Sequence, residues 1–363
     1  MNGSTKPHLL LLRFSALGDA AMVVHVILSL QRKYPGIRLT VATKPAFLPV
    51  FEAVPGVQGF HVQTRGRHKG LSGLWKLHRE LLAQNPDGIA DLHAVLRTRI
   101  LRFFFGAYPI PVAVLDKGRQ EKRRLTAATG KRWKPLKSTH QRYADVLARL
   151  GYPIEMEPGD VLQKAAWPAD MGLPQPPAAV KKIGLAPFAA HPGKCYPEDL
   201  IKEVLAKLSG EPEIRVFLFG GGPEESEKLR LWEAAFGNCV SVAGRGSLSQ
   251  ELRLISNLDL MVSMDSGNGH LAALYGVPVL TLWGVTHPYT GFAPFGQPPE
   301  HSLMADRDMY PQIPTSVYGN KVPEGYHRVM ETIPPETVCG KILEILGPGG
   351  PGQARTTGER ERK

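Results

Sequence analysis

The sequence predicts an α/β protein built from two doubly wound domains in series. Short apolar runs of strand length alternate with amphipathic helical runs in two blocks, and a proline-rich stretch at 167–177 separates the blocks. Such alternation is typical of parallel sheets covered by helices on both faces. We therefore expect domains at 1–166 and 178–346, a linker at 167–177, a disordered tail at 347–363, and a ligand cleft between the domains.

The strands are expected where apolar residues cluster, and the helices where they recur every three or four positions, as Met22, Val23, Val26, Ile27 and Leu30 do. The strands expected in the first block are 8–12, 38–42, 59–62, 88–90 and 112–115, and the helices are 19–34, 46–53, 73–84, 96–105 and 140–150. The strands expected in the second block are 182–186, 214–219, 260–263 and 279–283, and the helices are 197–208, 224–236, 250–257, 270–275 and 334–346.

Length and composition exclude several classes of protein. The chain of 363 residues is 43% hydrophobic and 21% charged, which is ordinary for a globular protein with two cores. No apolar run approaches the ~20 residues that span a bilayer, and the run 9–12 is too short for a secretion signal. The three cysteines form neither a metal-binding spacing nor a disulfide framework, which fits a reducing cytoplasm.

The formal net charge of +11 points to an anionic partner. Basic residues cluster at 65–69, 97–102 and 117–137, all within the first block. Nucleic acid, an anionic membrane and a phosphorylated substrate are all compatible with this charge, but no nucleic-acid-binding motif is present. Because two of these clusters follow predicted strands, we expect one set of cations to bind an acidic acceptor: Arg65, Arg67, Lys69, Arg97 and Arg99.

Two loops between a strand and a helix carry the best candidate site residues. The loop 265–270, Asp-Ser-Gly-Asn-Gly-His, opens a helix, and a helix N-terminus at a strand end suits an anion such as phosphate. The loop 13–19 ends in Asp19, in the first turn of the next predicted helix. The alternatives are a crossover loop that only caps its helix and an acid that only complements a helix dipole.

Two further loops of the second block are candidates for the same ligand. Lys194 follows a strand and precedes a helix, where its compact charge suits a phosphate group. In the run 220–225, glycines such as Gly221 allow close approach of a ligand, and Glu225 is able to accept hydrogen bonds from ribose hydroxyls. A solvated lysine and a tight glycine turn are the alternatives at these two places.

With these loops in view, the chain resembles the ADP-heptose:lipopolysaccharide heptosyltransferase family, glycosyltransferase family 9. The resemblance covers most of 8–346, and four further short segments resemble the branch of the family found in Bacteroidetes. The matching segments are Arg-Phe-Ser-Ala-Leu-Gly-Asp at 13–19, Lys-Cys-Tyr-Pro at 194–197, Asp-Ser-Gly-Asn-Gly-His-Leu-Ala-Ala at 265–273, Gly-Val-Pro at 276–278 and Gly-Val-Thr at 284–286. The segments typical of the branch are 91–97, 116–119, 286–289 and 318–321.

The resemblance implies a GT-B fold, in which two Rossmann-like domains face each other across a cleft. The second domain would hold an ADP-sugar and the first a lipopolysaccharide-core acceptor. It implies an inverting transfer without a cofactor or metal, with Asp19 as the base and Lys194 at the diphosphate. The donor loop would supply Asp265, Ser266, Gly267 and His270. It further implies a cytoplasmic protein bound peripherally to the inner face of the inner membrane.

The residue types agree with this chemistry but leave alternatives open. We expect one base in the first-domain loop rather than the paired carboxylates of hydrolytic or retaining enzymes, and no Asp-x-Asp pair to hold a divalent ion between the protein and the diphosphate. Ala189 and Ala190 stand where better-known members carry hydroxyl groups that help to bind phosphate. A member using another nucleotide sugar, a two-domain epimerase and a non-catalytic protein that binds nucleic acid or lipid are the remaining alternatives.

Overall fold

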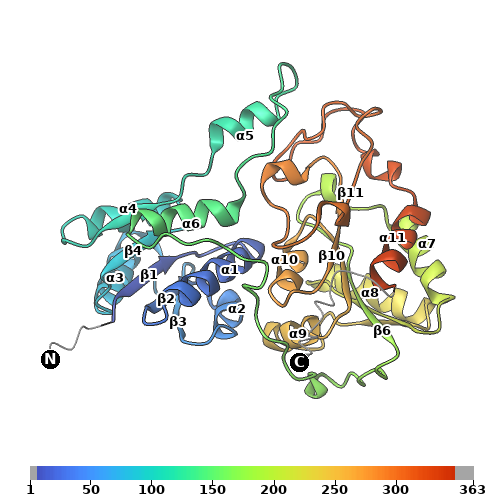
Figure 1. The fold of residues 1–363 in the computed structure, drawn as a ribbon, viewed down its shortest axis with the longest axis horizontal. Helices are drawn as coiled ribbons and strands as arrows, with labels where there is room; N and C mark the ends of the chain where they lie inside the picture. Colours follow the sequence, from blue (N-terminus) through green and yellow to red (C-terminus); the bar gives the residue numbers. More distant parts are fainter. Residues whose placement is uncertain (1–5, 348–363) are drawn as a thin grey trace, which may run out of the picture.

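The protein folds into two α/β units, each built on one parallel sheet (Figure 1). The structure is a computed structural model, and it describes residues 6–347. The first sheet has the order β3-β2-β1-β4-β5, with all pairs parallel. Its strands are β1 (His8–Leu12), β2 (Arg38–Thr43), β3 (Val57–His61), β4 (Gly88–Asp91) and β5 (Val112–Val114).

Side chains alternate between the two faces of the first sheet, so each face has its own layer of helices. Leu9 and Leu11 pack with α1 (Leu17–Lys33), α2 (Leu48–Glu52) and α6 (Thr139–Arg149). The opposite face, with Leu10 and Leu12, packs against α3 (Gly70–Leu82) and α4 (Leu96–Phe105). A further short helix, α5 (Arg119–Leu125), stands away from both layers (Figure 1).

The second sheet has the order β11-β10-β9-β6-β7-β8 and is also parallel. One face packs against α7, α8 and α11, and the other against α9 and α10. Its strands are β6 (Lys181–Ala186), β7 (Ile214–Leu218), β8 (Cys239–Ser241), β9 (Leu260–Met264), β10 (Val279–Trp283) and β11 (Ser302–Met304). Its helices are α7 (Glu198–Ser209), α8 (Pro223–Ala235), α9 (Leu248–Ile255), α10 (Gly267–Ala273) and α11 (Pro335–Leu346).

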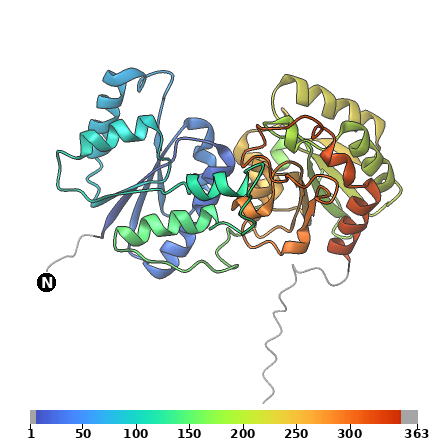
Figure 2. The same ribbon diagram turned by 90° about the horizontal axis from the view of Figure 1, so that it is seen from above.

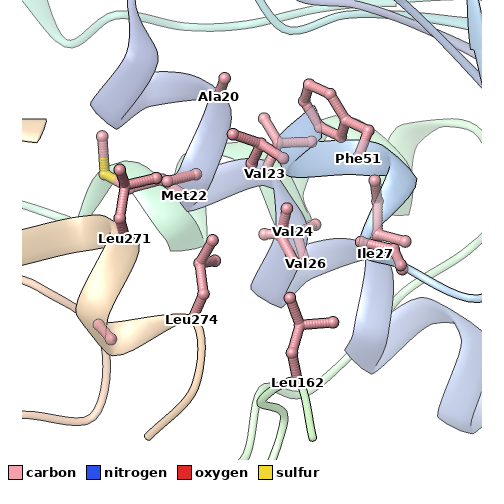
Figure 3. Close-up of a cluster of buried hydrophobic side chains, with 14 of the residues drawn as sticks. Ala20, Met22, Val23, Val24, Val26, Ile27, Phe51, Leu162, Leu271 and Leu274 are labelled. Carbon is pink, nitrogen blue, oxygen red and sulfur yellow. The ribbon is translucent and has the colours of Figure 1, made fainter. Parts of the chain in front are cut away.

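The two units share a continuous apolar core. Figure 3 shows Met22 of α1 beside Leu271 of α10, with Leu274 and Leu162 below them. The view from above in Figure 2 shows α1 and α10 at the junction between the two sheets. Because both helices start near this junction, the loops that precede them, after β1 and after β9, are brought together.

Backbone contacts strengthen the junction. The segment between α5 and α6 runs along the second unit, where the Leu136 and Thr139 amides donate to the Tyr289 and Gly291 carbonyls over 2.9 and 2.8 Å. Nearby, the Lys131 ammonium donates to the Gln312 and Pro314 carbonyl oxygens over 2.9 and 2.8 Å. These contacts hold the first unit's basic segment against the second unit.

The prediction of a doubly wound α/β architecture is confirmed, and the differences concern short elements. The strands β8 and β11 and the helix α5 were not predicted. The strands β8 and β11 have three residues each and contain a serine, so neither reads as an apolar run, and α5 reads as a run of charges. The predicted disordered tail, apart from Gly347, lies outside the described residues. Within 6–347, no helix combines the length and hydropathy needed to cross a bilayer.

Candidate active site

The loop after β1 places a carboxylate at the carboxyl edge of the first sheet. Asp19 lies in the first turn of α1, where the Ala16 amide donates to its Oδ2 over 3.4 Å. The buried Arg13 guanidinium forms an ion pair with the same oxygen. The other oxygen, Oδ1, accepts a long hydrogen bond of 3.5 Å from the Tyr143 hydroxyl. Because this bond is long, Oδ1 is the better placed oxygen to accept a substrate proton.

A cavity of about 290 Å³ opens beside Asp19, and both units line it. Phe292 and Tyr318 come from the second unit. A larger cavity of about 510 Å³ lies against Ile214, where β7 begins. Ligands of open α/β sheets bind at the carboxyl ends of strands, so we assign the site to the cavity beside Asp19.

The cavity is strongly cationic. Its lining includes Arg13, Lys117, Lys122 and Arg142. Lys122 is 8% exposed, and its ammonium lies 4.4 Å from the centre of the Phe292 ring. Burial, followed by the charge of Arg142, lowers the pKa of Lys122 to about 8. Arg13 and Arg142 pair with Asp19 and Glu121, so Lys117 and Lys122 are the charges best suited to a phosphate or an acidic sugar.

His93 lines the same cavity as a neutral imidazole. Burial, followed by the charges of Arg13 and Lys117, lowers its pKa to about 3. Its Nε2 lies 3.3 Å from the Ser15 hydroxyl. At neutral pH the ring therefore acts as a hydrogen-bonding group and adds no further positive charge.

Lys194 and Asp265, which lie in two different loops of the second unit, form an ion pair. The Lys194 ammonium lies 2.8 Å from Asp265 Oδ2 and donates to the Asp265 carbonyl over 3.0 Å. Both side chains are largely buried. The stem of Lys194 passes Gly319, where an added Cβ would lie 2.5 Å from Lys194 Cγ. An ammonium has three N–H donors, so one donor remains for a ligand phosphate.

The start of α1 touches the start of α10. A Cβ added to Gly18 would lie 3.0 Å from His270 Cδ2 and 3.3 Å from the Cα atom of Gly267. His270 is buried, and burial lowers its pKa. Its Nδ1 has no hydrogen-bond partner among residues 6–347. The predicted base and the predicted donor loop are thus neighbours, and Ser266 caps this same helix start with extended backbone.

The glycine-rich loop after β7 is held by a hydrogen bond to the side chain of Glu225. The Gly221 amide donates to Glu225 Oε2 over 2.7 Å. The carboxylate keeps a second oxygen that can accept from ligand hydroxyls. Burial raises the pKa of the Cys195 thiol. The nearby charge of Glu225 raises it further, and that of Lys194 lowers it. Glu225 and Lys194 thus both act electrostatically on Cys195, and the role of Glu225 in donor binding stays a prediction.

The five cations predicted to bind the acceptor do not line the cavity. Arg67 donates to Glu80 over 2.8 Å, on the side of β3 at the sheet edge. Arg97 lies in the first turn of α4, and its charge contributes to the lowered pKa of His93. Arg65, Lys69 and Arg99 are exposed. The assignments stay predictions, and Arg97 is the best placed of the five.

The cavity residues that sequence reasoning did not assign come from three places. Lys117 and Lys122 belong to the basic run 117–137, but a count of charges cannot tell which of them turn inward. Arg142 and Tyr143 lie on α6, and only its helical period was predicted. Tyr318 is in a loop of the second unit, and its proximity depends on the contact between the units.

No group of three or more His, Cys, Asp or Glu side chains within 6–347 is arranged to hold a metal ion. One Asp-x-Asp pair, Asp306 and Asp308, follows β11, outside the predicted donor loops. Asp306 Oδ1 accepts the backbone amides of Asp308 and Met309 over 2.7 and 3.3 Å, so this carboxylate closes a turn.

Two doubly wound units with a carboxylate, a largely buried lysine and a cationic cavity at their junction are the arrangement of a two-domain glycosyltransferase with the GT-B fold. Residues 36–313 match the sequence profile of "Glycosyltransferase family 9 (heptosyltransferase)". The chain belongs to glycosyltransferase family 9, as the resemblance indicated.

Characterised relatives support the same assignment. The chain is similar to "Lipopolysaccharide heptosyltransferase 1" of Pseudomonas aeruginosa, with 27% identity over 78% of this chain and 80% of that protein. It is also similar to "Lipopolysaccharide core heptosyltransferase OpsX" of Haemophilus influenzae, with 25% identity over 77% of this chain and 80% of that protein.

Solved structures share the fold. A family 9 glycosyltransferase from Veillonella parvula superimposes with a TM-score of 0.69 at 20% identity, covering 95% of this chain and 98% of that chain. The E. coli heptosyltransferase WaaC with ADP gives a TM-score of 0.67 at 19% identity, covering 93% and 99%. The predicted GT-B fold is therefore confirmed.

Proposed function

We propose that the protein transfers a heptose, or a closely related sugar, from an ADP-sugar to a lipopolysaccharide-core acceptor. Support comes from the family, from relatives named as lipopolysaccharide heptosyltransferases, and from a structural neighbour that holds ADP. The observation that carries the proposal is the contact of Gly18 with His270, which brings the Asp19 carboxylate beside the loop of Asp265.

The transfer is a single displacement with inversion at the anomeric carbon. Asp19 Oδ1 takes the proton of the acceptor hydroxyl, and the acceptor oxygen attacks the anomeric carbon of the donor. The bond from that carbon to the diphosphate oxygen breaks, and its electron pair leaves with ADP. The ion pair with Arg13 fixes the orientation of the Asp19 carboxylate, so Oδ1 stays directed at the cavity side shared with Tyr143.

The second unit stabilises the charge that develops on departing ADP. Lys194 is held at two points by Asp265 and offers its third N–H to a phosphate oxygen. The backbone amides at Ser266 and Gly267, in the first turn of α10, are further donors. These fixed donors stabilise the negative charge on the diphosphate, as a divalent cation does in other enzymes, so the transfer is metal-independent. Glu225 accepts hydrogen bonds from the ribose.

The cationic cavity holds the acceptor. Lys117 and Lys122 neutralise the acidic or phosphorylated sugar next to the reacting hydroxyl, and Arg142, which pairs with Glu121, lines the same cavity. At the rim, Arg97 supplies longer-range attraction. A lipopolysaccharide acceptor is anchored in lipid, so the protein works as a peripheral protein on the cytoplasmic face of the inner membrane.

A donor and acceptor assay tests this function. The purified chain is incubated with ADP-heptose and a lipopolysaccharide acceptor that lacks heptose, and ADP release and acceptor mass are followed together. We expect one heptose gained per ADP released, with the opposite anomeric configuration in the product by NMR. Transfer from another nucleotide sugar in place of ADP-heptose would contradict the donor assignment. It would indicate that Ala189 and Ala190, which replace hydroxyl groups of better-known members, alter the donor preference.

A further inference from the structure

Helices α3 and α4 lie side by side on one face of the first sheet, away from the junction with the second unit (Figure 1). Their outward sides carry large apolar side chains that nothing in the described chain covers. Phe103 is 81% exposed, Leu71 68% and Trp75 49%. Leu71 and Trp75 are four residues apart and therefore share one face of α3. Such a concentration of exposed apolar groups indicates a binding surface.

The two helices form one continuous surface. The Trp75 ring contacts the Phe104 ring of α4 edge-on, with 5.1 Å between the ring centres. Leu96, which is 72% exposed, and Phe103 are seven residues apart and so lie on the same face of α4. We call Leu71, Trp75, Leu96 and Phe103 the α3–α4 surface.

Positive charge surrounds the α3–α4 surface. Lys76 and Arg79 on α3 and Arg99 on α4 are exposed among its apolar groups. The nearby acids are already engaged: Glu80 pairs with Arg67 and His68, and the buried Asp91 pairs with Arg102. The net charge presented to a partner by these two helices is therefore positive.

We propose that the α3–α4 surface docks the protein onto an anionic phospholipid bilayer. Aromatic and aliphatic groups interspersed with lysine and arginine match the interfacial region of a bilayer, where apolar groups enter the headgroup layer and cations meet lipid phosphates. The centre of a protein–protein interface is instead depleted of lysine, although it is enriched in arginine and aromatic residues. The exposed Lys76 beside Trp75, with no unpaired acid nearby among residues 6–347, therefore favours lipid.

The position of the surface fits a lipid-anchored acceptor. Helix α4 begins three residues after His93, which lines the cavity beside Asp19, and its ten residues extend about 15 Å. Docking through α3 and α4 thus holds the cavity within about one helix length of the lipid. This inference rests on the proposed function for the identity of the acceptor, but the surface itself can be tested without a sugar donor.

The test measures sedimentation of the full-length protein with vesicles of phosphatidylethanolamine and phosphatidylglycerol. The variant carries Leu71→Ser and Phe103→Ser, one change on each helix. The matched control carries Leu231→Ser and Leu343→Ser on α8 and α11, whose side chains are 55% and 43% exposed. We expect the first variant to bind the vesicles about tenfold more weakly or worse, and the control to bind like the wild type.

Charge and environment give two further readouts. Lys76→Glu is expected to weaken binding to anionic vesicles, with a loss that shrinks as salt rises, because the surface potential is screened. Vesicles should shift the tryptophan emission of the wild type to shorter wavelength, and Trp75→Phe should remove most of this shift. Activity on a water-soluble acceptor fragment should stay unchanged in the Leu71→Ser/Phe103→Ser variant, which shows that it is folded.

Three results would overturn the proposal. The first is that the wild type fails to bind anionic vesicles. The second is that the Leu71→Ser/Phe103→Ser variant binds them as well as the control does. The third is that the surface instead mediates self-association, which the variant abolishes. Failure of heptose transfer alone would overturn the proposed function and leave the vesicle result standing, so the two failures are distinguishable.

Discussion

Removal of the Lys194 side chain tests the assignment of the donor site, and the hydrogen bond that is lost sets the expected size of the change in ADP affinity. In Lys194→Ala, a phosphate loses a charge-assisted hydrogen bond, which is worth about 1.5–3 kcal/mol. This corresponds to a loss of roughly 10- to 150-fold in affinity for ADP. Adenosine lacks the diphosphate, so its affinity should change little. Calorimetry with both ligands measures the difference.

The same substitution has a cost for folding that must be separated from binding. Lys194 and Asp265 are 14% and 6% exposed, so Lys194→Ala leaves a buried carboxylate without its cation. Breaking such a pair costs about 3–5 kcal/mol of unfolding free energy. The double variant Lys194→Met/Asp265→Asn removes both charges and should recover most of the stability in urea unfolding, while the affinity for ADP stays low.

Two outcomes would refute this reasoning. Equal fractional losses for ADP and adenosine would mean that Lys194 acts on the shape of the site. Recovery of ADP affinity in the Lys194→Met/Asp265→Asn variant would mean that the pair serves the fold alone.

Three further predictions concern metal, the acceptor and pH. Transfer activity should survive excess EDTA; loss of activity that Mg²⁺ restores would contradict a metal-independent transfer. Arg97→Glu should raise the acceptor KM more than Arg65→Glu does, because Arg97, unlike Arg65, acts electrostatically on the cavity residue His93. The donor Kd should stay unchanged, and the effect on KM should be smaller at high salt. Equal effects of the two variants on the acceptor KM would remove the special role of Arg97. Lys122 has a pKa lowered to about 8, so it loses its charge as the pH rises above 8, and the KM for an anionic acceptor should then rise. Lys122→Arg should flatten this rise, and an unchanged profile would separate Lys122 from the acceptor.

The elements that the sequence predicted best are those in which the local pattern alone decides the structure. The strands β1 and β10 match their predicted bounds because every side chain in them is buried and, apart from His8 and Thr281, every residue in them is apolar. Helix α4 matches because Thr98, Leu101 and Phe105 turn inward at helical spacing. Helix α5 was missed because six of its seven residues are polar or charged, although Lys122 on it is buried.

The site was predictable only as separate loops. Asp19 lies in the first turn of the helix after β1, and Lys194 and Asp265 each lie between a strand and the next α-helix, which are local patterns. The pairing of Lys194 with Asp265 joins positions 71 residues apart, and no spacing reveals it. The contact between Gly18 and His270 depends on how the two units meet through α1 and α10, which only the packed structure defines.

The catalytic role of Asp19 is the central claim, and Asp19→Asn tests it most directly. Asparagine keeps the shape of the side chain but cannot take the proton of the acceptor hydroxyl. We expect kcat to fall roughly 10²- to 10⁴-fold, the usual contribution of a general base, while the Kd for ADP stays close to that of the wild type. Turnover like that of the wild type would contradict the account and leave Asp19 as a partner of Arg13 and the α1 dipole.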